Sequence, residues 1–313
     1  MPDDPAPSLE PWAPDVAMAP APDLGREPEG YVVAADDGSK LHFLDWGGPD
    51  DASSGVLLLP GLLQPASSWT PVARRLARAA RVVVADLRGQ GLSDAPMDGY
   101  DLDTLAADAI AVAEGSGLAA TGPVVVAGHG FGAIVSAATA RALADRCAAV
   151  VLVDGGWERI EETTGVDVEE FLRGLDEPPE VMRSIDAYLA DRRGFDPGTW
   201  DADQERAARD AVVETAAGHV VRAVRPHVIE AMVRTMFEWD PAVGLAAIDT
   251  PVAALVALGT GDPATRLAEL RRSADARAAA GRPPVRVLGF PGVAHNLRRY
   301  RPADVAAAVL GIA

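Results

Sequence analysis

The chain alternates between short apolar runs and longer segments whose apolar residues recur at helical spacing. Residues 31–47, YVVAADDGSKLHFLDWG, contain two β-prone runs separated by Asp-Asp-Gly, which predicts a β-hairpin. The run VLLLP at 56–60 predicts a buried strand, and residues 67–79 have the apolar spacing of a helix. A second apolar run, RVVVADL, follows at once, so this part of the chain predicts a βαβ unit.

The same alternation continues to the end of the chain. Helices are predicted at 102–114, 131–145 and 264–280, and strands in the runs PVVVAG, AAVVLVD, PVAALVAL and VRVLGF. Strands that alternate with helices form a mostly parallel sheet with helices on both faces. The predicted fold class is therefore α/β, with a mostly parallel, doubly wound sheet.

Two segments depart from this pattern. Residues 1–28 are rich in Pro, Ala and Asp, a composition that predicts a mostly disordered tail. Residues 156–241 are acidic and helix-prone, and they interrupt the succession of strands. We expect them to form a helical lid, inserted between two strands of a core made by residues 29–155 and 242–313.

Composition narrows the class of protein and its partners. Hydrophobic residues make up 49% and charged residues 24% of the 313 residues, which is typical of a soluble globular protein. The net charge of −18 repels phosphate backbones, so nucleic acid is not expected as a partner. No apolar run reaches the roughly 18 residues of a membrane span. The single Cys147 excludes an intramolecular disulfide, and a cytoplasmic location is expected.

The glycines Gly128, Gly130 and Gly132 stand between a predicted strand and a predicted helix. Such a turn is typical either of a dinucleotide-binding site or of a nucleophile elbow. The dinucleotide fingerprint needs its third glycine at position 133, where this chain has alanine. Asp154, however, stands about where that fingerprint places its ribose-binding acid. The nucleotide interpretation is therefore disfavoured but stays open on these residues alone.

The segment Gly128-His129-Gly130-Phe131-Gly132 resembles the G-x-S-x-G elbow of the α/β-hydrolase family, with glycine at the nucleophile position. Other landmarks of that family follow the same order along the chain from about residue 31 to 313. LLPGLLQPASSW, which ends at Trp69, resembles the oxyanion loop, and DLRGQGLSD resembles the loop after the next strand. LGTGD and GVAHN resemble the segments that carry the catalytic acid and the histidine.

This resemblance implies a catalytic arrangement in the order nucleophile, acid, base. It assigns these places to Gly130, Asp262 and His295. His295 would act as the base, and Asp262 would hold its imidazole in one tautomer. Asp154, which ends the strand run AAVVLVD, is the rival acid, because some members of the family present the acid there.

The resemblance also implies an oxyanion hole made by the backbone N–H groups of Leu62 and Phe131. The substrate pocket is expected to be apolar and lined by Trp69, Trp157, Met232 and Met236. The histidines show no metal-ligand spacing, so neither a metal nor a cofactor is expected.

Glycine at position 130 bears directly on function, because it has no side-chain atom that can attack a carbonyl. We favour an enzyme in which His295 activates water or removes a substrate proton, as a hydrolase, lyase or isomerase. Its expected substrate is a small, mainly apolar carbonyl or ester compound. Two alternatives stay open: a non-catalytic protein that binds a small molecule, and a serine hydrolase whose nucleophile was mutated to glycine. Oligomeric state is left open by the sequence.

Overall fold

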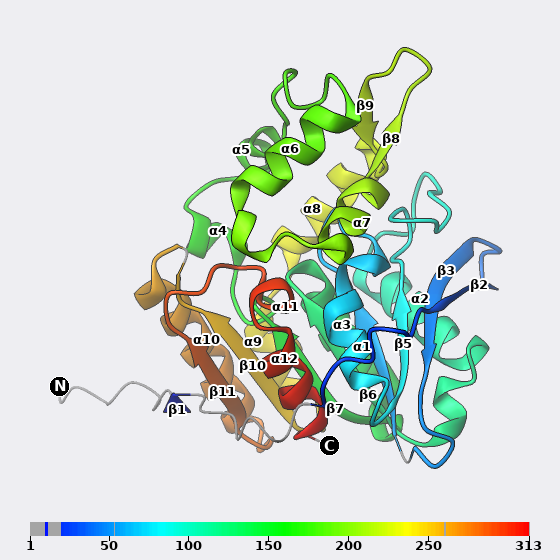
Figure 1. Ribbon diagram of the computed structural model, residues 1–313. Helices are drawn as coiled ribbons and strands as arrows, with labels where there is room; N and C mark the ends of the chain where they lie inside the picture. Colours follow the sequence, from blue (N-terminus) through cyan, green and yellow to red (C-terminus); the bar gives the residue numbers. More distant parts are fainter. Residues whose placement is uncertain (1–9, 12–19, 53, 260, 313) are drawn as a thin grey trace.

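A mostly parallel β-sheet forms the centre of the molecule (Figure 1). The computed structural model describes residues 10–11, 20–52, 54–259 and 261–312. Within them, nine strands form one sheet in the order β1-β11-β10-β7-β6-β4-β5-β3-β2. Strand β3 (Lys40–Gly47) is antiparallel to both of its neighbours, β2 (Glu29–Ala34) and β5 (Arg81–Ala85). Every other pairing is parallel, which confirms the predicted fold class.

The central strands are buried because helices cover both faces of the sheet. These strands are β4 (Gly55–Leu59), β5, β6 (Val124–His129), β7 (Cys147–Val153) and β10 (Val252–Ala257). Strand β11 (Val285–Phe290) is buried only in its second half. Successive side chains of a strand point to opposite faces. Leu57 and Leu59 of β4 accordingly belong to one hydrophobic core, and Val56 and Leu58 belong to the other.

The helices of the core divide between these two faces. One face is covered by α1 (Thr70–Leu76) and α12 (Pro302–Leu310), which pack against each other, with α11 (Leu297–Tyr300) and the 3-10 turn Ala66–Trp69 nearby. The other is covered by α2 (Leu102–Gly115), α3 (Phe131–Leu143), α9 (Pro241–Ala246) and α10 (Pro263–Ala279). Further 3-10 turns lie at Leu118–Thr121 and Ala144–Arg146. The helices expected at 102–114, 131–145 and 264–280 correspond to α2, α3 and α10.

The inserted segment, residues 156–241, lies between β7 and β10 in the sequence and above the core in the view of Figure 1. Its helices are α4 (Ile160–Thr164), α5 (Val168–Gly174), α6 (Ile185–Phe195), α7 (Ala202–Asp210) and α8 (Pro226–Glu238), with a 3-10 turn at Pro197–Thr199. It also contains an antiparallel hairpin, β8 (Val212–Glu214) and β9 (Val220–Arg222), which the sequence did not predict. Each of these strands is only three residues long.

Part of the expected N-terminal tail is bound to the body. Residues 1–9 and 12–19 lie outside the described residues, so the prediction of disorder stays a prediction there. Strand β1 (Glu10–Pro11) pairs parallel with β11. The largely buried Arg74 donates to the backbone oxygen of Arg26 at 3.2 Å and to the Glu27 carboxylate at 2.8 Å. Residues around Glu27 are therefore held by hydrogen bonds, which corrects the expectation of disorder for this part.

Gly132→Ala is expected to destabilise the fold by about 3 kcal/mol, because an added methyl group would overpack the turn after β6. Its Cβ would lie 2.4 Å from the carbonyl oxygens of both Leu59 and Pro60, which are backbone atoms that cannot rotate away. Gly194→Ala in α6 is the control, because nothing lies within 4 Å of its added Cβ. Urea unfolding measures both variants. Equal midpoints would show that the fold does not depend on this close approach.

Candidate active site

Gly130 forms the sharp turn between β6 and α3. Its backbone has φ +54° and ψ −118°, a conformation that residues other than glycine rarely adopt. Its N–H donates to the oxygen of Val153 at 3.1 Å, which fixes the turn against the neighbouring strand. A Cβ built at this glycine would lie 3.4 Å from Nε2 of His295. The space that a side chain would occupy here therefore faces the imidazole.

His295 lies in the loop after β11 and is oriented by a carboxylate. Its Nδ1 is 2.6 Å from Oδ2 of Asp154. The His295 side chain is 51% exposed, whereas the Asp154 side chain is completely buried. A carboxylate that accepts the Nδ1–H bond leaves the other ring nitrogen, Nε2, as a proton acceptor. That is the nitrogen that faces Gly130.

Asp154 follows directly after β7 and is held on both of its oxygens. Its Oδ1 accepts a 2.7 Å hydrogen bond from the N–H of Ala257 and is 3.1 Å from the guanidinium of Arg266. Arg266 also binds the Glu158 carboxylate through two hydrogen bonds of 2.8 and 3.0 Å. Burial alone would lower the pKa of Arg266, but Glu158 and Asp154 outweigh it and raise that pKa above its usual value. The carboxylate beside His295 thus has a fixed orientation.

Asp262 does not take the place that the sequence analysis gave it. Its side chain caps the N-terminus of α10, accepting hydrogen bonds of 3.2 Å from the N–H groups of both Ala264 and Thr265. The Thr265 hydroxyl and these N–H groups lower the pKa of this exposed carboxyl. The residue stands several positions beyond the end of β10, whereas Asp154 stands directly at the end of the neighbouring β7. The structure therefore pairs His295 with Asp154, and the prediction for Asp262 is corrected.

A pocket of about 450 Å³ opens at Gly130 and His295. The two residues expected to form an oxyanion hole, Leu62 and Phe131, both line it. Phe131 is the first residue of α3, and the first N–H groups of a helix have no partner inside that helix. The arrangement is compatible with a donor role for both backbone groups, which stays a prediction.

The apolar part of this lining differs from the expected one. Its larger apolar residues are Leu62, Leu63, Phe131 and Ile134 from the core and Ile160, Phe171, Leu175 and Met236 from the inserted segment. Of the four side chains predicted for the substrate pocket, Met236 lies in this lining, and its role toward a substrate stays a prediction. Trp69, Trp157 and Met232 are 0% exposed and pack in the hydrophobic cores, which corrects their assignment. An apolar stripe on a helix has the same spacing whether it packs into a core or lines a cavity.

His129 supports the loop that carries His295. Its Nε2 is 3.0 Å from the backbone oxygen of His295, and its Nδ1 is 3.3 Å from Oε1 of Gln64. Burial, assisted by the nearby His295 and Arg298, lowers the pKa of His129 well below its usual value. At neutral pH this ring is uncharged, and its contacts suit a positioning role.

The described residues contain no group of three or more His, Cys, Asp or Glu side chains placed to hold a metal ion. The thiol of Cys147 lies away from the pocket, and burial raises its pKa to about 11. It is therefore protonated at neutral pH and is not an activated nucleophile. In the same part of the chain, no helix is both long and apolar enough to cross a membrane.

The chain belongs to the alpha/beta hydrolase family, whose model matches residues 56–308. It is 36% identical over 118 residues to N-formylmaleamate deformylase from Pseudomonas putida, covering 37% of this chain and 42% of the relative. It is 35% identical over 123 residues to a non-heme chloroperoxidase from Streptomyces lividans, covering 39% and 43%. The chain thus spans less than half the length of these relatives in sequence.

Similarity of the backbone extends further. The crystal structure of E-2-(acetamidomethylene)succinate hydrolase superposes with a TM-score of 0.74 at 21% identity, covering 91% of this chain and 99% of that one. Such a likeness establishes a common fold. It does not establish a common activity, because one fold supports many chemistries.

Proposed function

We propose that this chain is an enzyme that hydrolyses a small, mainly apolar carbonyl or ester compound with water activated by His295. One observation carries the proposal: His295 is bound to Asp154 at 2.6 Å through Nδ1, while its Nε2 faces the empty side-chain position of Gly130 at 3.4 Å. The missing side chain leaves room for a water molecule beside the base.

In the proposed reaction, water takes the place of the missing nucleophile. Its oxygen bonds to the carbonyl carbon while one of its protons moves to Nε2 of His295. The electron pair of the C=O double bond moves to the oxygen, where the N–H groups of Leu62 and Phe131 stabilise the negative charge. When the C=O bond forms again, the leaving group departs and takes the proton from the imidazolium. Asp154 accepts the Nδ1–H bond throughout.

The apolar lining of the pocket supports a substrate that is largely apolar around its reacting carbonyl. The relatives named N-formylmaleamate deformylase and 2-(acetamidomethylene)succinate hydrolase act, by their names, on small carbonyl compounds, which supports the proposed size and the carbonyl group of the substrate. Because the inserted segment contributes Ile160, Phe171 and Met236 to the pocket, we include it in the proposal as a lid that limits access of bulk water.

A non-catalytic binding protein is the second candidate. It is favoured by Gly130, because the acyl-enzyme route of serine hydrolases needs a nucleophilic side chain there. A serine hydrolase whose nucleophile was replaced by glycine would have the same geometry. Retention of a fixed Asp154–His295 pair favours an enzyme over a binding protein, since binding alone does not need an oriented base.

His295→Ala is expected to reduce hydrolysis of p-nitrophenyl acetate and butyrate by about 10²-fold to 10⁴-fold, the contribution of a general base. The thermal midpoint is expected to change little, because this side chain is half exposed. The control is His219→Ala, a histidine of the inserted segment that bonds the backbone oxygen of Arg183. Unchanged turnover in His295→Ala would contradict the role of His295 as the general base. Turnover by the unaltered chain that never exceeds the buffer rate supports the binding protein.

A further inference from the structure

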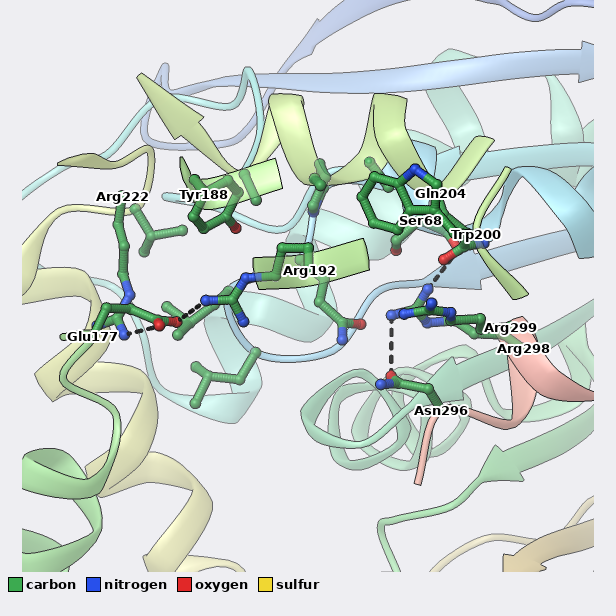
Figure 2. Close-up of a pocket in the computed structure, with 18 residues that line it drawn as sticks. Ser68, Glu177, Tyr188, Arg192, Trp200, Gln204, Arg222, Asn296, Arg298 and Arg299 are labelled. Carbon is green, nitrogen blue, oxygen red and sulfur yellow. Dashed lines mark hydrogen bonds and ion pairs between the residues drawn. The ribbon is translucent and has the colours of Figure 1, made fainter. Parts of the chain in front are cut away.

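A second pocket, of about 270 Å³, adjoins the one at Gly130 (Figure 2). The two pockets share the lining residues Leu62, Leu63, Gln64 and Asn296. Four arginines line the second pocket: Arg192 and Arg222 from the inserted segment, and Arg298 and Arg299 from α11. Glu177 is its one acidic lining residue. In a chain with a net charge of −18, this pocket is a local concentration of positive charge.

Arg298 is the arginine whose charge is least compensated. It is 5% exposed, and no acidic side chain of the described residues pairs with it. Its Nη1 donates to the backbone oxygen of Ser68 at 2.6 Å and its Nη2 to Oδ1 of Asn296 at 3.4 Å, while Nε has no partner. Burial lowers the pKa of Arg298 to about 9, so the side chain is still a cation at neutral pH. A buried cation without a counter-charge is unfavourable, and an anion in the pocket would stabilise it.

A second buried donor lines the same pocket without a partner. The hydroxyl of Ser68, a residue that is 4% exposed, makes no hydrogen bond within the described chain. Buried polar groups are normally hydrogen-bonded, so such a group indicates an absent partner. Figure 2 shows Ser68 above the guanidinium groups of Arg298 and Arg299, whereas the guanidinium of Arg192 points away from them toward Glu177. Arg192 is compensated by Glu177 at 2.6 Å, so the uncompensated charge lies on the α11 side.

We propose that this pocket binds a carboxylate group of the substrate, with Arg298 and Ser68 as its donors. The planar guanidinium matches the planar carboxylate, and hydrogen bonds between charged partners are the strong ones. This inference rests on the proposed function, which puts the reacting carbonyl of the substrate beside Gly130. Because Leu62 and Asn296 line both pockets, a carboxylate bound in the second pocket would lie next to that carbonyl. The substrate class is then a short organic acid with an apolar region around the bond that is hydrolysed.

The first test measures binding alone, by calorimetric titration of the chain with succinate. Arg298→Gln is expected to weaken succinate binding by about 30-fold or more, since truncating one partner of a buried charge pair is costly. Arg146→Gln is the matched control, because it removes the same charge from an exposed arginine paired with Glu114. It is expected to leave the Kd within about twofold, in keeping with the small contribution of exposed ion pairs.

Three results would overturn the inference: succinate binding unchanged in Arg298→Gln, equally tight binding of uncharged dimethyl succinate, or binding of inorganic phosphate in preference to succinate. Because Arg298 also bonds the backbone at Ser68, its variant can fail to fold. Ser68→Ala, which removes the other proposed donor and breaks no hydrogen bond of the described residues, then serves as the second variant. It is expected to weaken succinate binding several-fold, and an unchanged Kd would equally contradict the proposal.

A second test separates this inference from the proposed function. It compares turnover of mono-4-nitrophenyl succinate and of p-nitrophenyl butyrate by the unaltered chain and by Gly130→Ser. A preference for the acidic ester that is lost in Arg298→Gln supports the carboxylate site. Turnover of both esters without preference rejects the carboxylate site and keeps the proposed function. If succinate binding depends on Arg298 but neither ester is turned over, the carboxylate site is supported and the proposed function is rejected.

Discussion

Gly130→Ser is expected to raise hydrolysis of p-nitrophenyl acetate by about 10³-fold or more over the chain as it stands. In a serine hydrolase, removal of the nucleophile costs on the order of a million-fold in turnover, while the oxyanion hole and binding retain about 10³-fold over water. Restoring a hydroxyl therefore has a large effect wherever the rest of the site is intact. The Cβ of residue 130 would lie 3.4 Å from Nε2 of His295, so a serine hydroxyl can reach hydrogen-bond distance of the base.

Two further variants give this experiment its controls. Gly130→Ala introduces the same strain at φ +54° without a hydroxyl, so its activity is expected to stay at or below that of the unaltered chain. Gly130→Ser combined with His295→Ala is expected to lose the gain, because the serine then has no base. A transient acyl adduct on residue 130, detected by mass spectrometry, would identify the new route. A folded Gly130→Ser variant without any gain would show that the turn is not a competent nucleophile elbow.

Much of the fold was predictable because its strands and helices follow strong, separate patterns. Strand β4 is a continuous apolar run because both of its faces are buried, and the buried residues of α8 are all apolar and recur at helical spacing from Val228 to Met236. The exceptions are the shortest elements. Strand β1 has two residues and the β8–β9 hairpin has three-residue strands, so neither is long enough for an alternating pattern to be recognised.

A site residue could be predicted only where the sequence immediately around it forms a recognisable motif. Gly130 stands in a glycine-rich turn between strand and helix, and His295 in a recognisable loop after the last strand. The choice between Asp154 and Asp262 depends on which strand end lies beside that loop, which no local spacing reveals. Arg298 and Ser68 come from segments far apart in the sequence, and they meet only because α11 and the 3-10 turn Ala66–Trp69 lie on the same face of the sheet beside α1.

Asp154→Asn is expected to reduce hydrolysis by about 10⁴-fold in the Gly130→Ser background, the loss typical of a wrong histidine tautomer. The hydrogen bonds around Asp154 give the reason. Both the N–H of Ala257 and the guanidinium of Arg266 point at Oδ1, at 2.7 and 3.1 Å. The asparagine oxygen is therefore held at the Oδ1 position, and the amide NH₂ faces Nδ1 of His295. The ring must then accept at Nδ1 and carry its proton on Nε2, where it cannot act as a base.

Asp262→Asn is the matched variant, because it makes the same chemical change at the other acid. Asparagine is as good an N-cap as aspartate, so α10 keeps its first turn and the fold is expected to be intact. Activity is expected to stay within about twofold, since the side chain is exposed and bonds only the start of its own helix. Steady-state turnover and thermal midpoints of both variants separate a lost base from lost stability. Because the two variants differ only in which acid is altered, the reverse ranking would return the acid to Asp262 and require the loop of His295 to move toward α10 in the working enzyme.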